Sequence, residues 1–109
     1  MAATTHETCI AACNACAVAC DRCAGACLRE EDAQAMARCI ALDIDCAALC
    51  RLAAGVMARG SEFASLVCTL CAQVCDACAE ECAKHAMDHC RQCAEACRRC
   101  AGECRAMAV

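Results

Sequence analysis

Cysteine recurs every three or four residues along this chain, and this spacing constrains the fold more than any other feature of the sequence. The 109 residues include 19 cysteines, and fourteen of the eighteen gaps between successive cysteines are three or four residues long. Such steps average about 3.5 residues, a period that keeps side chains on one narrow face of an α-helix. The thiols therefore occupy the positions that leucine fills in an ordinary helical bundle, and the core must be lined with sulfur.

The remaining composition favours helices and limits the chain to a single domain over residues 1–109. Proline is absent, only four glycines and one Phe are present, and alanine is abundant. Alanine is the strongest helix former, whereas Val, Ile and Thr, which favour strands, are sparse. A chain this short usually needs metal, disulfides or oligomerisation to support its small core.

The cysteine pattern divides the chain into four helices. They are expected over about Thr5–Arg29, Ala33–Arg59, from Ser61 to about Lys84 and, after a turn near His85, to about Met107. Asp32 and Ser61 suit N-caps, and Gly60 suits the position after a helix C-terminus. Short loops make neighbouring helices antiparallel. The predicted fold class is all-α, an up-down-up-down antiparallel four-helix bundle with a Cys-lined core; the alternative is a long coiled coil of fewer helices.

Extending each cysteine stripe by the same steps identifies further candidate ligands. In the helix expected over 33–59, Asp43 occupies a stripe position that holds cysteine in the other helices. Beyond the last cysteines the stripes end in Met or His, at His6, Met36, Met57, His85, Met87 and Met107. The candidate metal ligands are His85, His89, Met36, Met87, Asp43 and the cysteines Cys9, Cys13, Cys16, Cys20, Cys23, Cys27, Cys39, Cys46, Cys50, Cys68, Cys71, Cys75, Cys78, Cys82, Cys90, Cys93, Cys97, Cys100 and Cys104.

Antiparallel helix order predicts two different bundle ends. One end gathers His6, Met57 and Met107, and we expect it to be plugged and dry because of the apolar residues at the same level: Ile10, Leu52, Val56, Phe63, Leu66 and Val67. The other end carries soft donors and charges, and is the better candidate for a mouth: Cys27, Glu30, Glu31, Met36, Cys82, Lys84, His85, Met87, Asp88 and His89.

Four uses of such a thiol column compete. Simple packing does not explain it, because Ala or Leu would pack without so many oxidisable groups. Disulfides fit poorly, because facing helix axes lie about 8–10 Å apart whereas a disulfide needs Cα atoms within about 7 Å. Zinc sites need separated sets of four ligands, and several four-thiolate zinc sites would accumulate buried negative charge. Iron–sulfur clusters need pockets wider than this helical seam provides.

Cu(I) fits the column best. This soft monovalent ion is selected by thiolate and thioether ligands. Each thiolate is shared between two ions, so about one Cu(I) per thiolate leaves the core neutral from end to end. Binding displaces thiol protons, so copper uptake should release protons. The sequence therefore predicts multiple Cu(I) ions per chain.

Charge and the N-terminal sequence limit the partners and the location that we expect for the protein. A net charge of −4 argues against a nucleic-acid partner. No signal peptide and no run of transmembrane length is recognised, so we expect no membrane association and a cytoplasmic location, where thiols stay reduced. No catalytic residue set is found, so the chain is not expected to be an enzyme. The alternative functions are a thiol-redox protein and a zinc buffer.

The cysteine ladder resembles that of the bacterial copper storage proteins, cytosolic branch. The resemblance covers nearly the whole chain, through the ladder of residues 9–27, Met57-Ala-Arg-Gly-Ser-Glu-Phe-Ala, Cys68-Thr-Leu-Cys-Ala-Gln-Val-Cys and Met87-Asp-His-Cys-Arg-Gln-Cys. It implies a four-helix bundle that stores and detoxifies cytosolic Cu(I) along its core and associates as a homotetramer. It also implies that His85 and His89 handle incoming metal at one end.

A second apolar row lies beside the cysteine stripe on two of the helices. It consists of Leu42, Leu49, Leu52 and Val56, and of Phe63, Val67, Leu70 and Val74. These residues either seal the seams between helices or face another subunit. The resemblance favours a subunit interface through the second and third helices.

Overall fold

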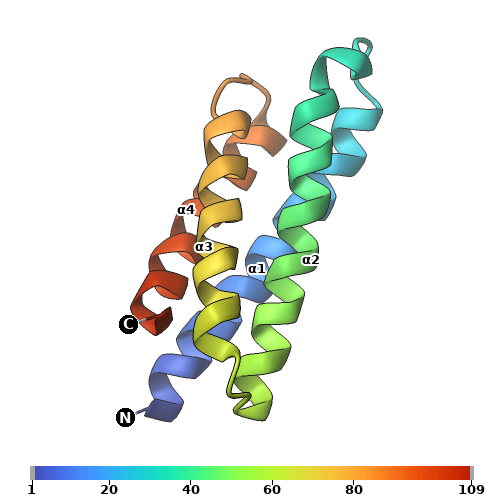
Figure 1. The fold of residues 1–109 in the computed structure, drawn as a ribbon. Coiled ribbons are helices and arrows are strands. Elements are labelled where there is room, and N and C mark those ends of the chain that lie inside the picture. The colour runs from blue at the N-terminus through green and yellow to red at the C-terminus, as the bar shows by residue number, and fades with distance from the viewer. Residues whose placement is uncertain (1, 109) are drawn as a thin grey trace.

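Four long antiparallel helices form the fold (Figure 1). The computed structural model describes residues 2–108, and the side chains from His6 to Met107. The helices are α1 (Ala2–Leu28), α2 (Ala37–Arg59), α3 (Ala64–Cys82) and α4 (Asp88–Ala108), and a short 3-10 helix, η1 (Ala33–Met36), precedes α2. Both α1 and α3 pack against α2 and α4, in a bundle of 46 × 17 × 17 Å. The predicted up-down-up-down four-helix bundle is confirmed.

The helix ends follow the sequence signals in part. The Asp32 carboxylate accepts a hydrogen bond from the Ala35 backbone N–H at 3.3 Å and caps η1. Gly60 ends α2 with φ of 67°, a left-handed conformation that favours glycine. The prediction that Ser61 caps the third helix is wrong. Its hydroxyl accepts from the Phe63 N–H at 3.1 Å within a turn, and α3 begins only at Ala64.

The core consists of cysteine, with alanine along the seams between helices. All nineteen cysteines are fully buried. Buried alanines, among them Ala17, Ala47, Ala72 and Ala94, flank the cysteine stripes. Because a methyl group is small, the helices approach one another closely enough to enclose a single column of sulfur. The 3.5-residue period thus fixes which face of each helix points inward.

The larger apolar side chains are mostly outside this core. Leu52, Phe63, Leu66 and Leu70 are between 48% and 68% exposed. The prediction that Phe63, Leu66 and Leu52 plug one end of the bundle is therefore wrong. That end is closed by the following residues, of which the first two are buried and the last two partly buried: Val56, Met57, Ile10 and Val67.

One span of α1, His6–Leu28, is long and apolar enough to cross a membrane by length and composition alone. The expectation that no run reaches transmembrane length is therefore wrong. All six cysteines of this span are fully buried in the core, and Ala12, Ala17 and Ala24 are buried beside them. On the outer face Asp21 accepts a hydrogen bond from Arg51 of α2 at 2.7 Å. Since core helices of soluble bundles pass the same test, the span is weak evidence for a membrane location.

Asp43 of α2 lies fully buried among thiols. The Cys78 and Cys93 thiols each donate to its Oδ1 at 3.2 Å, and the Cys82 thiol does so at 3.6 Å. Burial, reinforced by the nearby thiols, raises the pKa of Asp43 to about 10. The carboxyl group is therefore neutral in the metal-free protein at neutral pH, which makes a polar residue tolerable in this core.

The raised pKa predicts that Asp43 makes the metal-free protein less stable as the pH rises. An unfolded Asp has a pKa near 3.9, so between there and about pH 10 unfolding releases a proton. Stability contributed by the protonated carboxyl is complete below about pH 4 and is lost as the pH rises toward the folded pKa.

Urea denaturation of reduced, metal-free protein measures this effect against the D43N variant, which cannot ionise there. From about pH 5 to about pH 7, the free energy of unfolding of the wild type should fall relative to D43N by up to about 1.4 kcal/mol per pH unit. Parallel pH profiles for the two proteins would contradict a buried, protonated carboxyl.

Candidate metal centre

The thiols form a continuous column in which neighbouring sulfurs approach without bonding. Across the bundle, the Cys46 and Cys75 Sγ atoms are 3.5 Å apart and those of Cys16 and Cys97 are 3.6 Å apart. Along α4, the Cys93 and Cys97 Sγ atoms are 3.9 Å apart. A disulfide bond is about 2.05 Å long. All nineteen cysteines are free, so the structure contains no disulfide scaffold.

Overlapping groups of four thiols run along the column. In each group the sulfur atoms lie within 4.8 Å of one another, close enough to bind one metal ion. They include Cys13, Cys71, Cys100 and Cys104; Cys16, Cys46, Cys50 and Cys75; Cys16, Cys20, Cys46 and Cys97; Cys20, Cys78, Cys93 and Cys97; and Cys23, Cys27, Cys39 and Cys90. Several thiols belong to two groups, so neighbouring metal sites would share ligands.

Burial keeps thiols at both ends of the column protonated. It raises the pKa of Cys68 and that of Cys90, each to about 11, and it also raises the pKa of Cys27. A metal ion that binds must therefore displace protons. Exchange of one proton for one monovalent ion preserves neutrality, whereas four thiolates around one divalent ion leave a net charge of −2 in the core.

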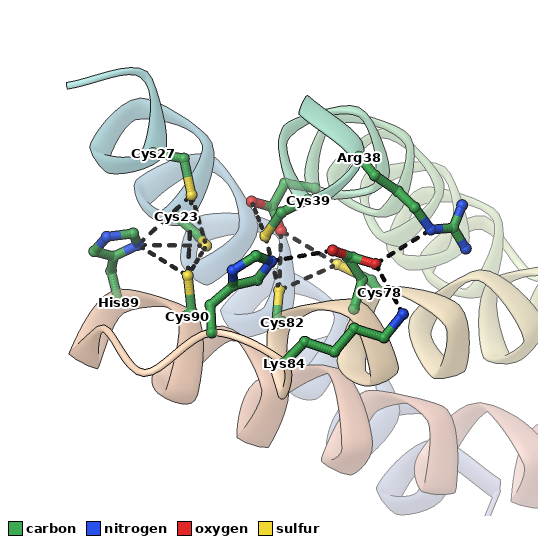
Figure 2. A network of polar contacts seen from close by, with 12 residues as sticks. Cys23, Cys27, Arg38, Cys39, Cys78, Cys82, Lys84, His89 and Cys90 are labelled. Carbon is green, nitrogen blue, oxygen red and sulfur yellow. Dashed lines mark hydrogen bonds and ion pairs between the residues drawn. The ribbon is translucent and has the colours of Figure 1, made fainter. Parts of the chain in front are cut away.

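One end of the bundle carries Glu30, Lys84, His85 and Asp88, and we call it the polar end. His89 joins the thiol column at this end (Figure 2). Its Nδ1 atom is 3.5 Å from the Cys90 sulfur, 3.6 Å from that of Cys23 and 3.9 Å from that of Cys27. Its Nε2 atom lies 3.1 Å from a carboxylate oxygen of Glu30 in the turn after α1. The imidazole ring therefore bridges a carboxylate at the surface and three thiols inside.

His85 lies at the same end but pairs with a carboxylate and not with a thiol among the described residues. Its Nε2 atom is 3.0 Å from Glu81 Oε2, and the other oxygen of Glu81 accepts from Arg38 at 3.2 Å and from Lys84 at 3.4 Å. Burial pulls the pKa of Glu81 upward, but the hydrogen bond from His85 and the charge of Lys84 outweigh it and lower the pKa. Arg38 and Lys84, both labelled in Figure 2, therefore contact the same carboxylate oxygen.

The remaining predicted ligands lie near the column. Met36 is buried, and Met87 is half-buried against the cysteine core at the polar end. Sequence reasoning missed Glu81, although it lies only four residues before His85, which follows the end of α3 in the turn to α4. It noted Glu30 only as a charge near the mouth, because nothing in the local sequence indicates its contact with His89.

Comparison with known proteins gives a consistent result. The family model of the copper storage proteins (Csp) matches residues 2–109. The structure of the Cu(I)-bound copper storage protein BsCsp3 shares 46% identity with a TM-score of 0.93, over 96% of this chain and 99% of that chain. The copper-free copper storage protein 3 of Bacillus subtilis shares 47% identity with a TM-score of 0.90, over 94% and 98% of the two chains.

A third relative comes from another organism. A cytosolic copper storage protein from Streptomyces lividans, solved with five coppers, shares 41% identity with a TM-score of 0.93, over 96% of this chain and 92% of that chain. A search of curated proteins found no match. On the family match and the sulfur-lined bundle, the chain belongs to the copper storage protein family.

Proposed function

We propose that this protein stores Cu(I) in the cytosol and protects against its toxicity by binding many ions along the bundle core. The observation that carries the proposal is the column of overlapping, unbonded thiol groups, in which four sulfurs at a time lie within 4.8 Å. Soft thiolates select Cu(I), and shared ligands allow adjacent ions. The Cu(I)-bound relative with 46% identity supports the same assignment.

The charge of the core favours Cu(I) over a zinc buffer. Replacing each thiol proton with Cu(I) leaves the column neutral, whereas a series of buried four-thiolate zinc sites adds a charge of −2 at each site. A thiol-redox role is also disfavoured, because reactive cysteines are partially exposed and all nineteen thiols here are fully buried. The role is storage and not catalysis.

The residues at the polar end take part in copper uptake. His89 accepts the ion beside Cys23 and Cys90, and His85 assists at the same end, as the positions of both rings suggest. Met36 and Met87 supply thioethers next to the first thiols. Asp43 contacts the Cys78 and Cys93 thiols and contributes an oxygen ligand for copper where the cysteine stripe of α2 is interrupted.

A homotetramer formed through α2 and α3 accounts for the exposed apolar residues. Leu66 and Leu70 lie on one face of α3, and Phe63 directly precedes this helix; the three side chains are 48–68% exposed, and Leu52 of α2 is 48% exposed. Leu66 and Leu70 also line a surface groove with Val67. An apolar face of this kind is typical of a protein–protein interface. Burial in an oligomer would stabilise a chain whose own core is built from small side chains.

Anaerobic titration of reduced protein with Cu(I), against a chromogenic chelator, tests the storage function. We expect the chain to withhold on the order of ten or more Cu(I) ions, because soft thiolates are shared between neighbouring sites. Replacing Cys46 with Ser should lower this number, since Cys46 belongs to two thiol groups. The control is Ala48→Ser on the exposed side of the same helix.

A capacity of only a few ions per chain would contradict the storage function. Equal capacities for the wild type and the Cys46→Ser variant would contradict the assignment of Cys46 as a copper ligand.

Light scattering tests the tetramer. The wild type should have about four times the 11.3 kDa mass of one chain, and Leu66→Glu should give smaller species because it buries charge in an apolar interface. Leu28→Glu is the matched control, because Leu28 is 62% exposed at the end of α1 and belongs to neither of the helices that form the proposed interface. A wild-type monomer at micromolar concentration would contradict the assembly.

A further inference from the structure

We propose that Cys23, Cys27, Cys90 and His89 form a tetrahedral site for one Zn²⁺ ion per chain at the polar end of the bundle. The set combines α1 cysteines with two adjacent residues of α4. This inference goes beyond copper storage, since it concerns a different metal and does not require the interior of the column to be filled.

The positions of the four donor atoms match a tetrahedral zinc site. Zn–S bonds of about 2.3 Å and Zn–N bonds of about 2.05 Å place the sulfurs about 3.8 Å apart and each sulfur about 3.6 Å from the nitrogen. The Cys23–Cys27 and Cys23–Cys90 sulfur distances are 3.8 Å each, and the Cys27–Cys90 distance is 4.0 Å. The His89 Nδ1 atom is 3.5, 3.6 and 3.9 Å from these sulfurs.

The ring of His89 is held in the orientation that such a site needs. Its Nε2 atom is 3.1 Å from the Glu30 carboxylate, a pairing that favours the tautomer with the proton on Nε2 and the Nδ1 lone pair toward the three sulfurs. Histidine ligands of zinc usually donate their second N–H to a carboxylate or a carbonyl in this way. Figure 2 shows the ring directed at Cys23, Cys27 and Cys90.

Charge favours this set over the thiol groups deeper in the column. Three thiolates and one neutral imidazole leave a net charge of −1 around Zn²⁺, and the His89 side chain is 21% exposed, so water reduces the cost. An interior four-thiolate site carries −2 with no exposure of its ligands. The same comparison applies to Cys39, which also lies within 4.8 Å of the three sulfurs and offers an all-thiolate alternative to His89.

The site is tested by titrating metal-free, reduced protein with Zn²⁺ against a chelating indicator. Co²⁺ serves as a spectroscopic probe of the same site. We expect one high-affinity equivalent per chain, with the visible absorption bands of tetrahedral Co²⁺ and sulfur-to-cobalt charge transfer. Glu30→Gln should weaken the affinity about 10- to 100-fold, the usual effect of losing an outer carboxylate. Glu31→Gln, an exposed neighbour of Glu30, is the matched control and should bind like the wild type.

Substitution of the ligands decides between the two donor sets. His89→Ala should weaken the first equivalent more than Glu30→Gln does and should shift the Co²⁺ bands. A larger loss in Cys39→Ser than in His89→Ala would overturn the proposal in favour of the all-thiolate group. Several equal Zn²⁺ equivalents that do not respond to His89→Ala would also overturn it, because the ion would then occupy the interior.

The zinc titration tests the zinc site independently of the storage function. If no tight Zn²⁺ equivalent is found while the Cu(I) capacity remains on the order of ten ions, only the zinc site fails. If one Zn²⁺ binds at His89 but the Cu(I) capacity is a few ions, only the storage function fails. Circular dichroism of each variant shows whether the helices are retained, and Glu30→Gln, at the surface, tests the site without removing a core side chain.

Discussion

The close approach of unbonded thiols along the bundle axis is the constraint on which the rest of this structure depends. Sulfurs of facing helices are as close as 3.5 Å, and all nineteen cysteines are fully buried. Helices enclose such a column when alanine along their seams lets them pack closely, so the larger apolar side chains are left on the outside. The buried side chains are mostly small, so each removes little apolar surface from water, and metal binding and subunit contacts are the natural sources of additional stability.

Neutrality is the second condition that the core must meet. Burial keeps thiols at both ends of the metal-free column neutral, and it also keeps the Asp43 carboxyl neutral by raising its pKa to about 10. Any ion that enters must leave the charge close to zero, because an unbalanced charge in this interior has neither water nor an oppositely charged side chain beside it. Monovalent copper meets this condition throughout the column, whereas a divalent ion meets it only where ligands reach the solvent.

The sequence period predicted the fold and the identity of the core, because both depend on which helix face a residue occupies. The same reasoning correctly placed Gly60 and Asp32, whose roles are local. It failed for Phe63 and Leu66, which lie at the level of one end of the bundle but off the cysteine stripe, so their side chains are exposed. It also did not reveal that His89 contacts Glu30 or that Arg38 contacts Glu81, because each pair joins segments far apart in the chain.

The two bundle ends therefore differ in chemistry as well as in polarity. At the polar end an imidazole that contacts a carboxylate lies beside three thiols. In the interior the candidate ligands are thiols, with the Asp43 carboxyl as the exception. Imidazole suits borderline ions such as zinc, and thiolate-only surroundings suit Cu(I). On the two proposals together, donor softness increases from the mouth inward. Such a gradient draws Cu(I) past His89 into the column and holds a divalent ion at the surface, so the arrangement sorts metals by position within a single bundle.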